Sequence, residues 1–342
     1  MKRLFATLLA LTMILSVTAC GGQKQDSAPP APPENPASDP VEAPTTLDWP
    51  KRDISFICPA GAGGDTDYNT RLMARALEKK LGVSVVTTNV TGSNGAVCLT
   101  QYKDEPADDY TFIMTSTAVL SGNYATGLMD FGYEAYEPVC IYGISSGEVI
   151  LVSADSPYET LEDLIKASQE NPGSIIYGGP TGGATYLAGF LNLQERYDAK
   201  FSFMEAGDGA DRITALLGGH VNVTNTALIN CKEYIEAGQV RPLATMLSKA
   251  PSMMPDMRVA SESYPNTLLD TMYVCLALKG TDPAVIEKMN EVMLEVLATD
   301  EEFKADYESM NMQESFGMNI EDTTAELERQ KQQFVDLASL IK

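Results

Sequence analysis

The sequence contains a single histidine among 342 residues. That residue, His220, follows Gly218-Gly219 at the expected end of a helix, where a lone imidazole is most simply a surface side chain. Without a second histidine, neither a Ser-His-Asp triad nor a zinc site built on several histidines can be assembled. Ser93 and Ser116 have no evident general base nearby. A hydrolase is therefore a disfavoured alternative, which ester turnover abolished by Ser116→Ala would revive.

Positive charge is also scarce. The chain has 24 lysines and arginines against 47 aspartates and glutamates, which gives a net charge of -23. Nucleic acids and anionic membrane surfaces are poor partners for such a protein, so we expect no nucleic-acid partner. No apolar run in the sequence is long enough to cross a bilayer.

Cysteine is rare and scattered. Besides Cys20, the cysteines are odd in number and lie mostly among apolar residues: Cys58, Cys98, Cys140, Cys231 and Cys275. This pattern favours small buried side chains over a disulfide framework or a metal site, although a single pair among them stays open. We expect no metal and no cofactor.

The N-terminus has the features of a secretion signal. Lys2-Arg3 precedes an apolar run over residues 4–17, which is too short to span a bilayer. Val17-Thr18-Ala19-Cys20 resembles a bacterial lipobox and predicts a lipoprotein signal peptide over residues 1–19, with lipidation of Cys20. The alternative is an ordinary signal peptide with a chance cysteine. We expect an extracytoplasmic protein that is lipid-anchored to a bacterial cell membrane.

Residues 20–47 predict a disordered tether, because they are rich in proline, alanine, serine and acidic residues and show no apolar periodicity. The folded part is expected to begin near Trp49-Pro50. It is long enough for two lobes, each with its own core.

The chain is organised around a glycine-rich turn at residues 58–71. An alternating strand pattern over residues 53–57 precedes it, and apolar residues at helical spacing follow it. A strand-to-helix turn directs unpaired backbone N–H groups and the positive end of the helix dipole at a ligand, which predicts an anion site. The turn lacks both the P-loop ending and the dinucleotide fingerprint. The candidate ligand residues here are Ala60, Gly61, Gly63, Gly64, Asp65, Thr66 and Asp67.

The aspartates of this turn allow another interpretation. Asp65 or Asp67 could cap the following helix, with Asp67 paired to Arg71 one helical turn further on. Asp65, Asp67 and Asp208 could also form a carboxylate pair, but they are better explained as caps or as partners for a ligand ammonium group.

Two further strands end in small polar turns. The strand over residues 83–88 leads into 89–96, and the strand over 111–114 leads into 115–118. Repeated strand–helix units predict a mainly parallel sheet with flanking helices, in which ligands bind beyond the carboxyl ends of the strands. The candidate ligand residues in these turns are Gly92, Ser93, Asn94, Gly95, Ser116 and Thr117.

A second lobe repeats this pattern. The strand over residues 174–179 ends in a glycine and hydroxyl turn, and the strands over 201–204 and 221–224 also lead into polar residues. The candidate residues of this lobe are Thr181, Gly182, Gly183, Ala184, Thr185, Asp208, Asn225 and Thr226. We expect residues 48–145 plus 265–342 to form the first lobe and 146–264 the second, closing on a small anion. Two helices, over 283–297 and 324–341, follow the last strand. The second of them is amphipathic and should pack on the outer surface of the first lobe.

The order of several motifs resembles the substrate-binding receptors of tripartite tricarboxylate transporters, also called Bug proteins. The markers are Trp49-Pro50, the turns at 59–71 and 89–96, Asp108 to Thr111, the Gly182 turn, residues 216–221, Arg241-Pro242-Leu243-Ala244 and Pro255-Asp256-Met257. The resemblance covers the whole mature domain. It implies a two-lobed type II periplasmic-binding-protein fold that traps a carboxylate without catalysis, the turns at 61–67 and 92–95 gripping one end and 181–185 helping to define the other.

The resemblance also implies delivery to a membrane permease with a large and a small subunit. We expect a monomer that binds a dicarboxylate, an amino acid or an aromatic acid. A ligand-sensing lipoprotein that reports to a membrane sensor kinase is the alternative.

The chain departs from the family where Glu205-Ala206-Gly207-Asp208 replaces a lysine-containing motif, where Gly182 to Leu187 lacks the usual histidine, and at Asn222. The lysine lost and the acids gained favour a ligand with fewer negative charges than citrate, or one that carries an ammonium group.

Overall fold

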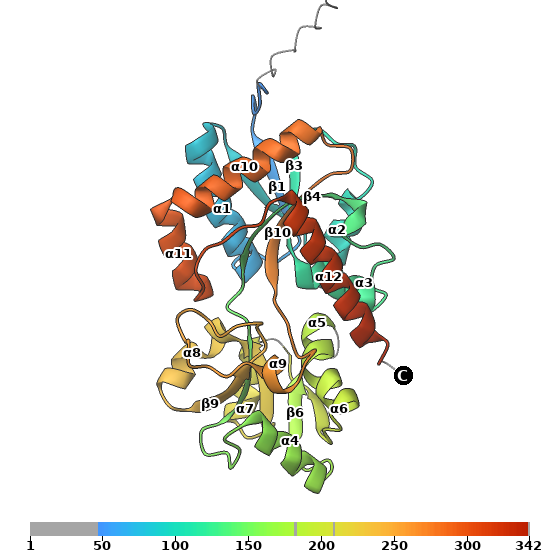
Figure 1. Cartoon of the computed structure of the whole chain (residues 1–342), viewed down its shortest axis with the longest axis vertical. Helices are drawn as coiled ribbons and strands as arrows, with labels where there is room; N and C mark the ends of the chain where they lie inside the picture. Colours follow the sequence, from blue (N-terminus) through green and yellow to red (C-terminus); the bar gives the residue numbers. More distant parts are fainter. Residues whose placement is uncertain (1–46, 181–182, 208, 341–342) are drawn as a thin grey trace, which may run out of the picture. The chain divides into compact units, whose positions relative to one another are not determined.

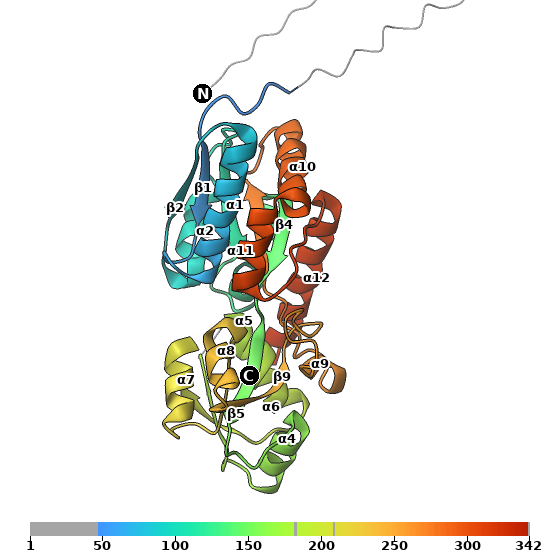
Figure 2. The same ribbon diagram turned by 90° about the vertical axis from the view of Figure 1, so that its left-hand side faces the viewer.

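The structure, a computed structural model, describes residues 47–180, 183–207 and 209–340. The signal peptide, Cys20 and the tether lie outside the described residues, and so do the predicted ligand residues Thr181, Gly182 and Asp208. Residues Leu47–Lys342 form one compact unit that contains two five-stranded sheets with helices around both (Figures 1 and 2).

The first sheet combines the N-terminal strands with one late strand. Its strands in spatial order are β2 (Val85–Asn89), β1 (Ile54–Cys58), β3 (Thr111–Ser116), β10 (Met272–Ala277) and β4 (Glu137–Ile144). β1 pairs in parallel with both β2 and β3, whereas β10 is antiparallel to both β3 and β4. Four strands therefore run in one direction and β10 runs against them.

Both faces of the first sheet are buried, because alternate residues of its strands enter two different cores. In β1, Ile54 and Phe56 join one core and Ile57 joins the other. The helices around this sheet are α1 (Asp65–Leu81), α2 (Ala96–Tyr102), α3 (Thr117–Ala125), α10 (Pro283–Thr299) and α11 (Glu301–Asn311), with the short turns η1 (Ser93–Gly95) and η2 (Tyr133–Ala135). The sequence interpretation had no helix at the position of α11.

The second sheet repeats the same topology. Its strands in spatial order are β7 (Ser202–Glu205), β6 (Ile176–Gly179), β8 (Val223–Ala227), β5 (Glu148–Ser153) and β9 (Val240–Thr245). β6 pairs in parallel with β7 and β8, and β5 runs antiparallel to β8 and β9. The two-lobed α/β fold is confirmed, but each sheet is mixed. The strand that follows a crossover, β10 in the first sheet and β5 in the second, runs antiparallel to its two neighbours.

Helices also cover both faces of the second sheet. They are α4 (Leu161–Glu170), α5 (Gly183–Tyr186), the π-helical turn η3 (Leu187–Leu191), α6 (Asn192–Arg196), α7 (Gly209–Leu217), α8 (Leu228–Glu236) and α9 (Ala260–Ser263). Thr160 and Asp163 form a complete capping box at the start of α4.

The chain passes between the sheets at two adjacent segments. β4 leads through Ser145 and Gly147 into β5, and Thr271 leads back into β10. The backbone N–H of Ser145 donates to the carbonyl oxygen of Thr271 at 2.8 Å, so the two segments are hydrogen-bonded to each other. The lobes are thus connected by a narrow pair of strands, which is the connection expected of a hinge.

The last helix, α12 (Ile320–Ala338), contacts both lobes (Figure 1). Leu327 lies in a core of the first sheet, whereas Phe334 and Leu337 lie in a core of the second. The prediction that this helix packs only on the first lobe is therefore wrong for its C-terminal half.

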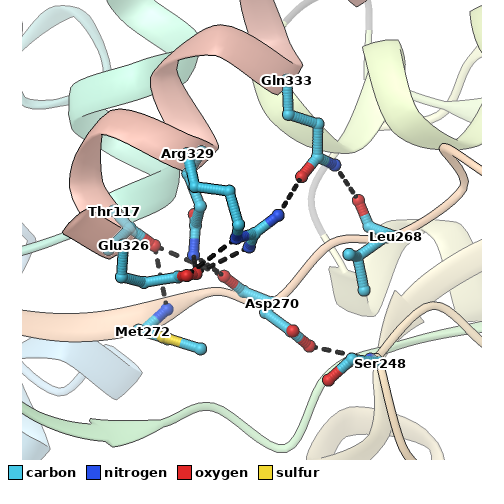
Figure 3. Close-up of polar contacts among 9 residues, drawn as sticks. Thr117, Ser248, Leu268, Asp270, Met272, Glu326, Arg329 and Gln333 are labelled. Carbon is cyan, nitrogen blue, oxygen red and sulfur yellow. Dashed lines mark hydrogen bonds and ion pairs between the residues drawn. The ribbon is translucent and has the colours of Figure 1, made fainter. Parts of the chain in front are cut away.

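The same helix holds the return segment between the sheets (Figure 3). Gln330 donates to the carbonyl oxygen of Asp270 at 3.0 Å, and Gln333 donates to that of Leu268 at 2.6 Å. Thr117 at the start of α3 also donates to the Asp270 carbonyl, at 3.4 Å. Side chains of α12 and α3 therefore fix the backbone of the segment at which a lobe movement would occur.

The five cysteines that the structure describes are all buried and free, as small core side chains would be. Among the described residues, no helix combines the length and apolar character needed to cross a membrane.

Candidate functional site

A cavity of about 500 Å³ lies between the two lobes. Turns of the first sheet supply most of its wall, and the crossover segments, α5 and the end of β8 supply the rest. The lining residues are Pro59, Ala60, Gly61, Asp65, Thr66, Thr91, Gly92, Ser93, Asn94, Gly95, Thr115, Ser116, Ala118, Val119, Ser145, Gly147, Glu148, Thr185, Ala227 and Thr271.

The turn between β1 and α1 is held by its own aspartate. Asp67 accepts a hydrogen bond from the backbone N–H of Gly63 at 2.9 Å and another from the Asn89 side chain at 2.8 Å. Its carboxylate also lies 3.0 Å from Nε of Arg71. Asp67 therefore fastens the turn to the end of β2, and the predicted pairing with Arg71 is confirmed.

These contacts make the stability of the protein dependent on the charge of Asp67. Burial disfavours that charge, but the hydrogen bonds from Arg71, Gly63 and Asn89 outweigh it and lower the pKa of Asp67 below 3.8. We expect Asp67→Asn to reduce the free energy of unfolding at pH 7 by about 2 kcal/mol, since the side chain is 4% exposed. A carboxyl group whose pKa is lower in the folded state than in the unfolded state stabilises the fold at any pH above its unfolded-state pKa. This stabilisation is lost as the pH falls through the folded-state pKa. The difference from wild type should therefore shrink below pH 3.8 in urea titrations.

Asp306→Asn is the matched control for this variant. Asp306 pairs with Arg75 at 3.5 Å, but both side chains are about half exposed. Exposed pairs contribute less than about 1 kcal/mol, so this variant should unfold almost as wild type does. Equal losses in the two variants would contradict the structural role given to Asp67.

The turn between β2 and α2 has an unusual backbone. Gly92, Ser93, Asn94 and Gly95 all have positive φ, and two of them carry side chains. Asn94 and Asn123 exchange two hydrogen bonds of 2.9 Å, which tie the turn to α3. The N–H of Gly95 donates to the carbonyl oxygen of Gly92 at 2.9 Å, which closes the turn on itself. Turns of this kind can present their remaining backbone N–H groups to an anion. Such strained turns are concentrated at functional sites.

The end of β3 contributes two hydroxyl groups to the cavity wall. Ser116 caps α3 by accepting a hydrogen bond from the N–H of Val119 at 3.4 Å. Thr115 is fully buried, and its hydroxyl oxygen has no hydrogen-bond partner among the described residues. A buried hydroxyl is rarely left without a partner, so Thr115 is suited to receive a ligand group.

The second lobe contributes a carboxylate through Glu148, the first residue of β5. Asn225 donates to its Oε2 at 2.8 Å, and Nη1 of Arg212 lies 3.8 Å from the same oxygen. Burial raises the pKa of Glu148 above 4.5, while Arg212 and Asn225 favour the ionised form. Glu148 is therefore a buried carboxyl group in the wall of the cavity whose ionised form a cationic ligand group would stabilise.

The structure brings together about half of the residues that the sequence predicted to bind a ligand. Those that line the cavity are Ala60, Gly61, Asp65, Thr66, Gly92, Ser93, Asn94, Gly95, Ser116 and Thr185. Those placed elsewhere are Gly63, Gly64, Asp67, Thr117, Ala184, Asn225 and Thr226; for Gly183 the structure gives no position relative to the cavity. Gly63 and Gly64 line a neighbouring cavity of about 440 Å³ that shares Asp65 with the first.

Two lining residues of chemical interest were not predicted. Thr115 belongs to the same run of hydroxyl residues as Ser116 and Thr117, which were predicted to bind the ligand. Glu148 is a charged residue directly before the apolar strand Val149 to Val152, which could have marked it as a residue at a strand end. Within residues 47–180, 183–207 and 209–340, no cluster of three or more histidine, cysteine or acidic side chains is placed to hold a metal ion.

Known proteins share this sequence pattern and fold. A family model described as tripartite tricarboxylate transporter family receptor matches residues 70–331. BugT of Bordetella pertussis is 29% identical over 266 residues, which cover 75% of this chain and 80% of BugT.

Solved structures agree with that match. A TctC solute-binding protein from Polaromonas has a TM-score of 0.74 at 22% identity, over 85% of this chain and 99% of that one. Rpa4515 of R. palustris, solved with adipate, has a TM-score of 0.71 at 22% identity, over 86% and 98% of the two chains. At these identities the structures show a shared two-lobed fold.

The family model spans most of the folded unit, and the sheet topology agrees with it. The chain therefore belongs to the receptor family of tripartite tricarboxylate transporters, the Bug proteins, which are extracytoplasmic solute-binding receptors and not enzymes.

Proposed function

We propose that this protein is a lipid-anchored receptor that captures a small carboxylate between its lobes and delivers it to a membrane permease with a large and a small subunit. The observation that carries the ligand class is the turn over residues 92–95, four residues of positive φ that line the inter-lobe cavity. Turns with such a backbone form anion-binding concavities. The N-termini of α1 and α3 border the same cavity and add favourable dipoles.

The strength of such a site is adequate for a transport receptor. A charge-assisted hydrogen bond contributes about 1.5–3 kcal/mol net. Micromolar binding needs roughly 8 kcal/mol, which several such bonds to one carboxylate supply together. The family relationship and the adipate with which Rpa4515 was solved support the same ligand class.

A binding screen tests this proposal. The purified protein, shown to be folded and ligand-free, is heated with a panel of dicarboxylates, amino acids and aromatic acids, and hits are measured by titration calorimetry. A ligand at a hundred times its dissociation constant adds about 2.7 kcal/mol and should raise Tm by several degrees. Failure of every acid to bind would overturn the proposal.

Thr115→Val separates binding from stability at this site. Removing an unpartnered buried hydroxyl should leave the free energy of unfolding unchanged or raise it by about 1 kcal/mol. The affinity for the ligand found in the screen should fall about tenfold, since one hydrogen bond is lost. Unfolding curves and calorimetry on the same preparations check the two effects. Unchanged affinity would remove Thr115 from the site.

The lipid anchor has its own test. If Cys20 carries the lipid, Cys20→Ala should release the protein from the membrane fraction of the producing cell and abolish labelling by a fatty-acid probe. Retention of the variant in the membrane fraction would contradict the anchor without affecting the ligand proposal.

We also propose the lobe boundaries 48–145 plus 265–342 and 146–264, with the C-terminal half of α12 crossing onto the second lobe and the protein acting as a monomer. The two sheets, each with one antiparallel crossover strand, support this division. Light scattering that gives one chain per particle, with and without ligand, is the expected result.

A further inference from the structure

Glu148 presents one carboxylate oxygen that its polar neighbours leave available. Its side chain is 15% exposed, and its contacts with Asn225 and Arg212 both involve Oε2. Tyr177 donates its hydroxyl to Oδ1 of Asn225 at 2.7 Å, which leaves the amide nitrogen of Asn225 to face Glu148. Asn225 and Arg212 thus orient the carboxylate through Oε2, and Oε1 is the atom that a ligand in the cavity can contact.

Asp65 supplies a second carboxylate to the same cavity from the first residue of α1. The N–H of Thr66 donates to its Oδ1 at 2.7 Å. The hydroxyl of Tyr273 lies 3.4 Å from its Oδ2 and 2.9 Å from Oδ1 of Asn311, so its single proton is shared between the two acceptors. These contacts hold Asp65 as a hydrogen-bond acceptor. Its charge is also close enough to add to the effect of burial on the pKa of Glu148.

The charges around the cavity favour a cationic group in the ligand. No lysine, arginine or histidine is among the described residues that line it. Asp65 and Glu148 are the charged side chains among those lining residues, and Arg212 lies 3.8 Å from Glu148 without lining the cavity itself. A ligand with two carboxylates would add to that charge, whereas an ammonium group would neutralise it.

The buried hydroxyl of Thr115 is an independent sign of a polar ligand. It lines the same cavity, is fully buried, and has no hydrogen-bond partner among the described residues. The cavity therefore combines a backbone turn suited to an anion, two carboxylates suited to a cation, and a hydroxyl that can serve either.

We propose that the solute is a zwitterion, a small amino acid whose carboxylate lies at the turn over residues 92–95 and whose ammonium group lies between Glu148 and Asp65. This inference rests on the function proposed above and narrows its ligand class. The anion turn belongs to the first lobe and Glu148 to the second. The two ends of one zwitterion would therefore hold the lobes together.

Calorimetry on matched pairs of ligands tests the inference. The probes are the protein amino acids and ω-amino acids of about three to five carbons, each compared with the same acid without its amino group and with the dicarboxylate of matching length. The best amino acid should bind at least about tenfold more tightly than its desamino partner and than the dicarboxylate.

The variant Glu148→Gln tests whether Glu148 is the residue that causes the preference for amino acids over desamino acids. The substitution removes the charge but keeps the volume and an oxygen that can accept from Asn225. We expect amino-acid affinity to fall at least tenfold, about 1.4 kcal/mol, and desamino-acid affinity to stay within about threefold. Glu137→Gln is the matched control, because Glu137 likewise begins a strand but pairs with Lys279 outside the cavity. It should bind all probes as wild type does.

The outcomes distinguish this inference from the proposed function. Tighter binding of dicarboxylates than of amino acids, or unchanged amino-acid affinity in Glu148→Gln, overturns the zwitterion and leaves the carboxylate receptor standing. Absence of binding by any acid overturns the proposed function itself. The ligand comparison uses wild-type protein alone, so it remains decisive if Glu148→Gln does not fold.

Discussion

Replacing Phe334 with alanine is expected to reduce the free energy of unfolding by about 3–5 kcal/mol, the usual cost of deleting a buried aromatic ring. Phe334 is 1% exposed and joins the core that covers one face of the second sheet, although its helix begins on the first. The loss should therefore weaken both the core and the contact of α12 with the second lobe. Urea unfolding monitored by circular dichroism measures it.

Val335→Ala is the control on the same helix. Val335 is 37% exposed, and alanine is the better helix former, so we expect a change within about 0.5 kcal/mol. If Phe334→Ala were as mild as this control, the C-terminal half of α12 would not pack on the second lobe as the structure has it.

Gly147→Ala is the second substitution with a large expected effect. Gly147 has a φ of +78° at the crossover between β4 and β5, where a side chain costs about 1–2 kcal/mol. A Cβ atom there would also overlap Cγ of Leu247, which is 1% exposed and has little room to move. Overpacking adds about 1–3 kcal/mol, so we expect a total loss of about 3 kcal/mol in urea unfolding.

Gly127→Ala isolates the backbone part of that loss. Gly127 has a similar φ of +72°, but a Cβ atom there would meet nothing within 4 Å. This variant should therefore lose only about 1–2 kcal/mol. Equal losses at the two positions would show that the crossover accommodates a side chain and is looser than the structure indicates.

Most strands and the turns after them could be predicted from the sequence, because alternation and glycine placement are local signals. β1 and β3 lie where those signals placed them. The direction of β10 and β5 could not be predicted in this way, since it depends on where a crossover returns the chain and not on the residues of the strand.

Helix α12 shows a second limit. Its apolar spacing correctly predicted an amphipathic helix with one buried side, and the structure confirms the helix over Ile320–Ala338. Periodicity indicates which side is buried but not what covers it. One continuous apolar stripe here meets the first lobe at Leu327 and the second at Phe334.

The candidate site shows the same limit at single residues. Gly92 to Gly95 could be predicted to line a cavity, because turns at the carboxyl ends of parallel strands converge at one edge of the sheet. Asp67 has the same carboxylate group as Asp65, yet it accepts hydrogen bonds from Gly63 and Asn89 and does not line the cavity. Glu148 comes to the cavity only because β5 begins beside the crossover, which is a property of the tertiary fold.

The most direct test of the proposed ligand site is a crystal structure of the protein with the tightest ligand from the screen. We expect density in the inter-lobe cavity, with a carboxylate at the turn over residues 92–95 and the other end of the ligand near Glu148. A ligand bound elsewhere, or one whose carboxylate points away from that turn, would contradict it.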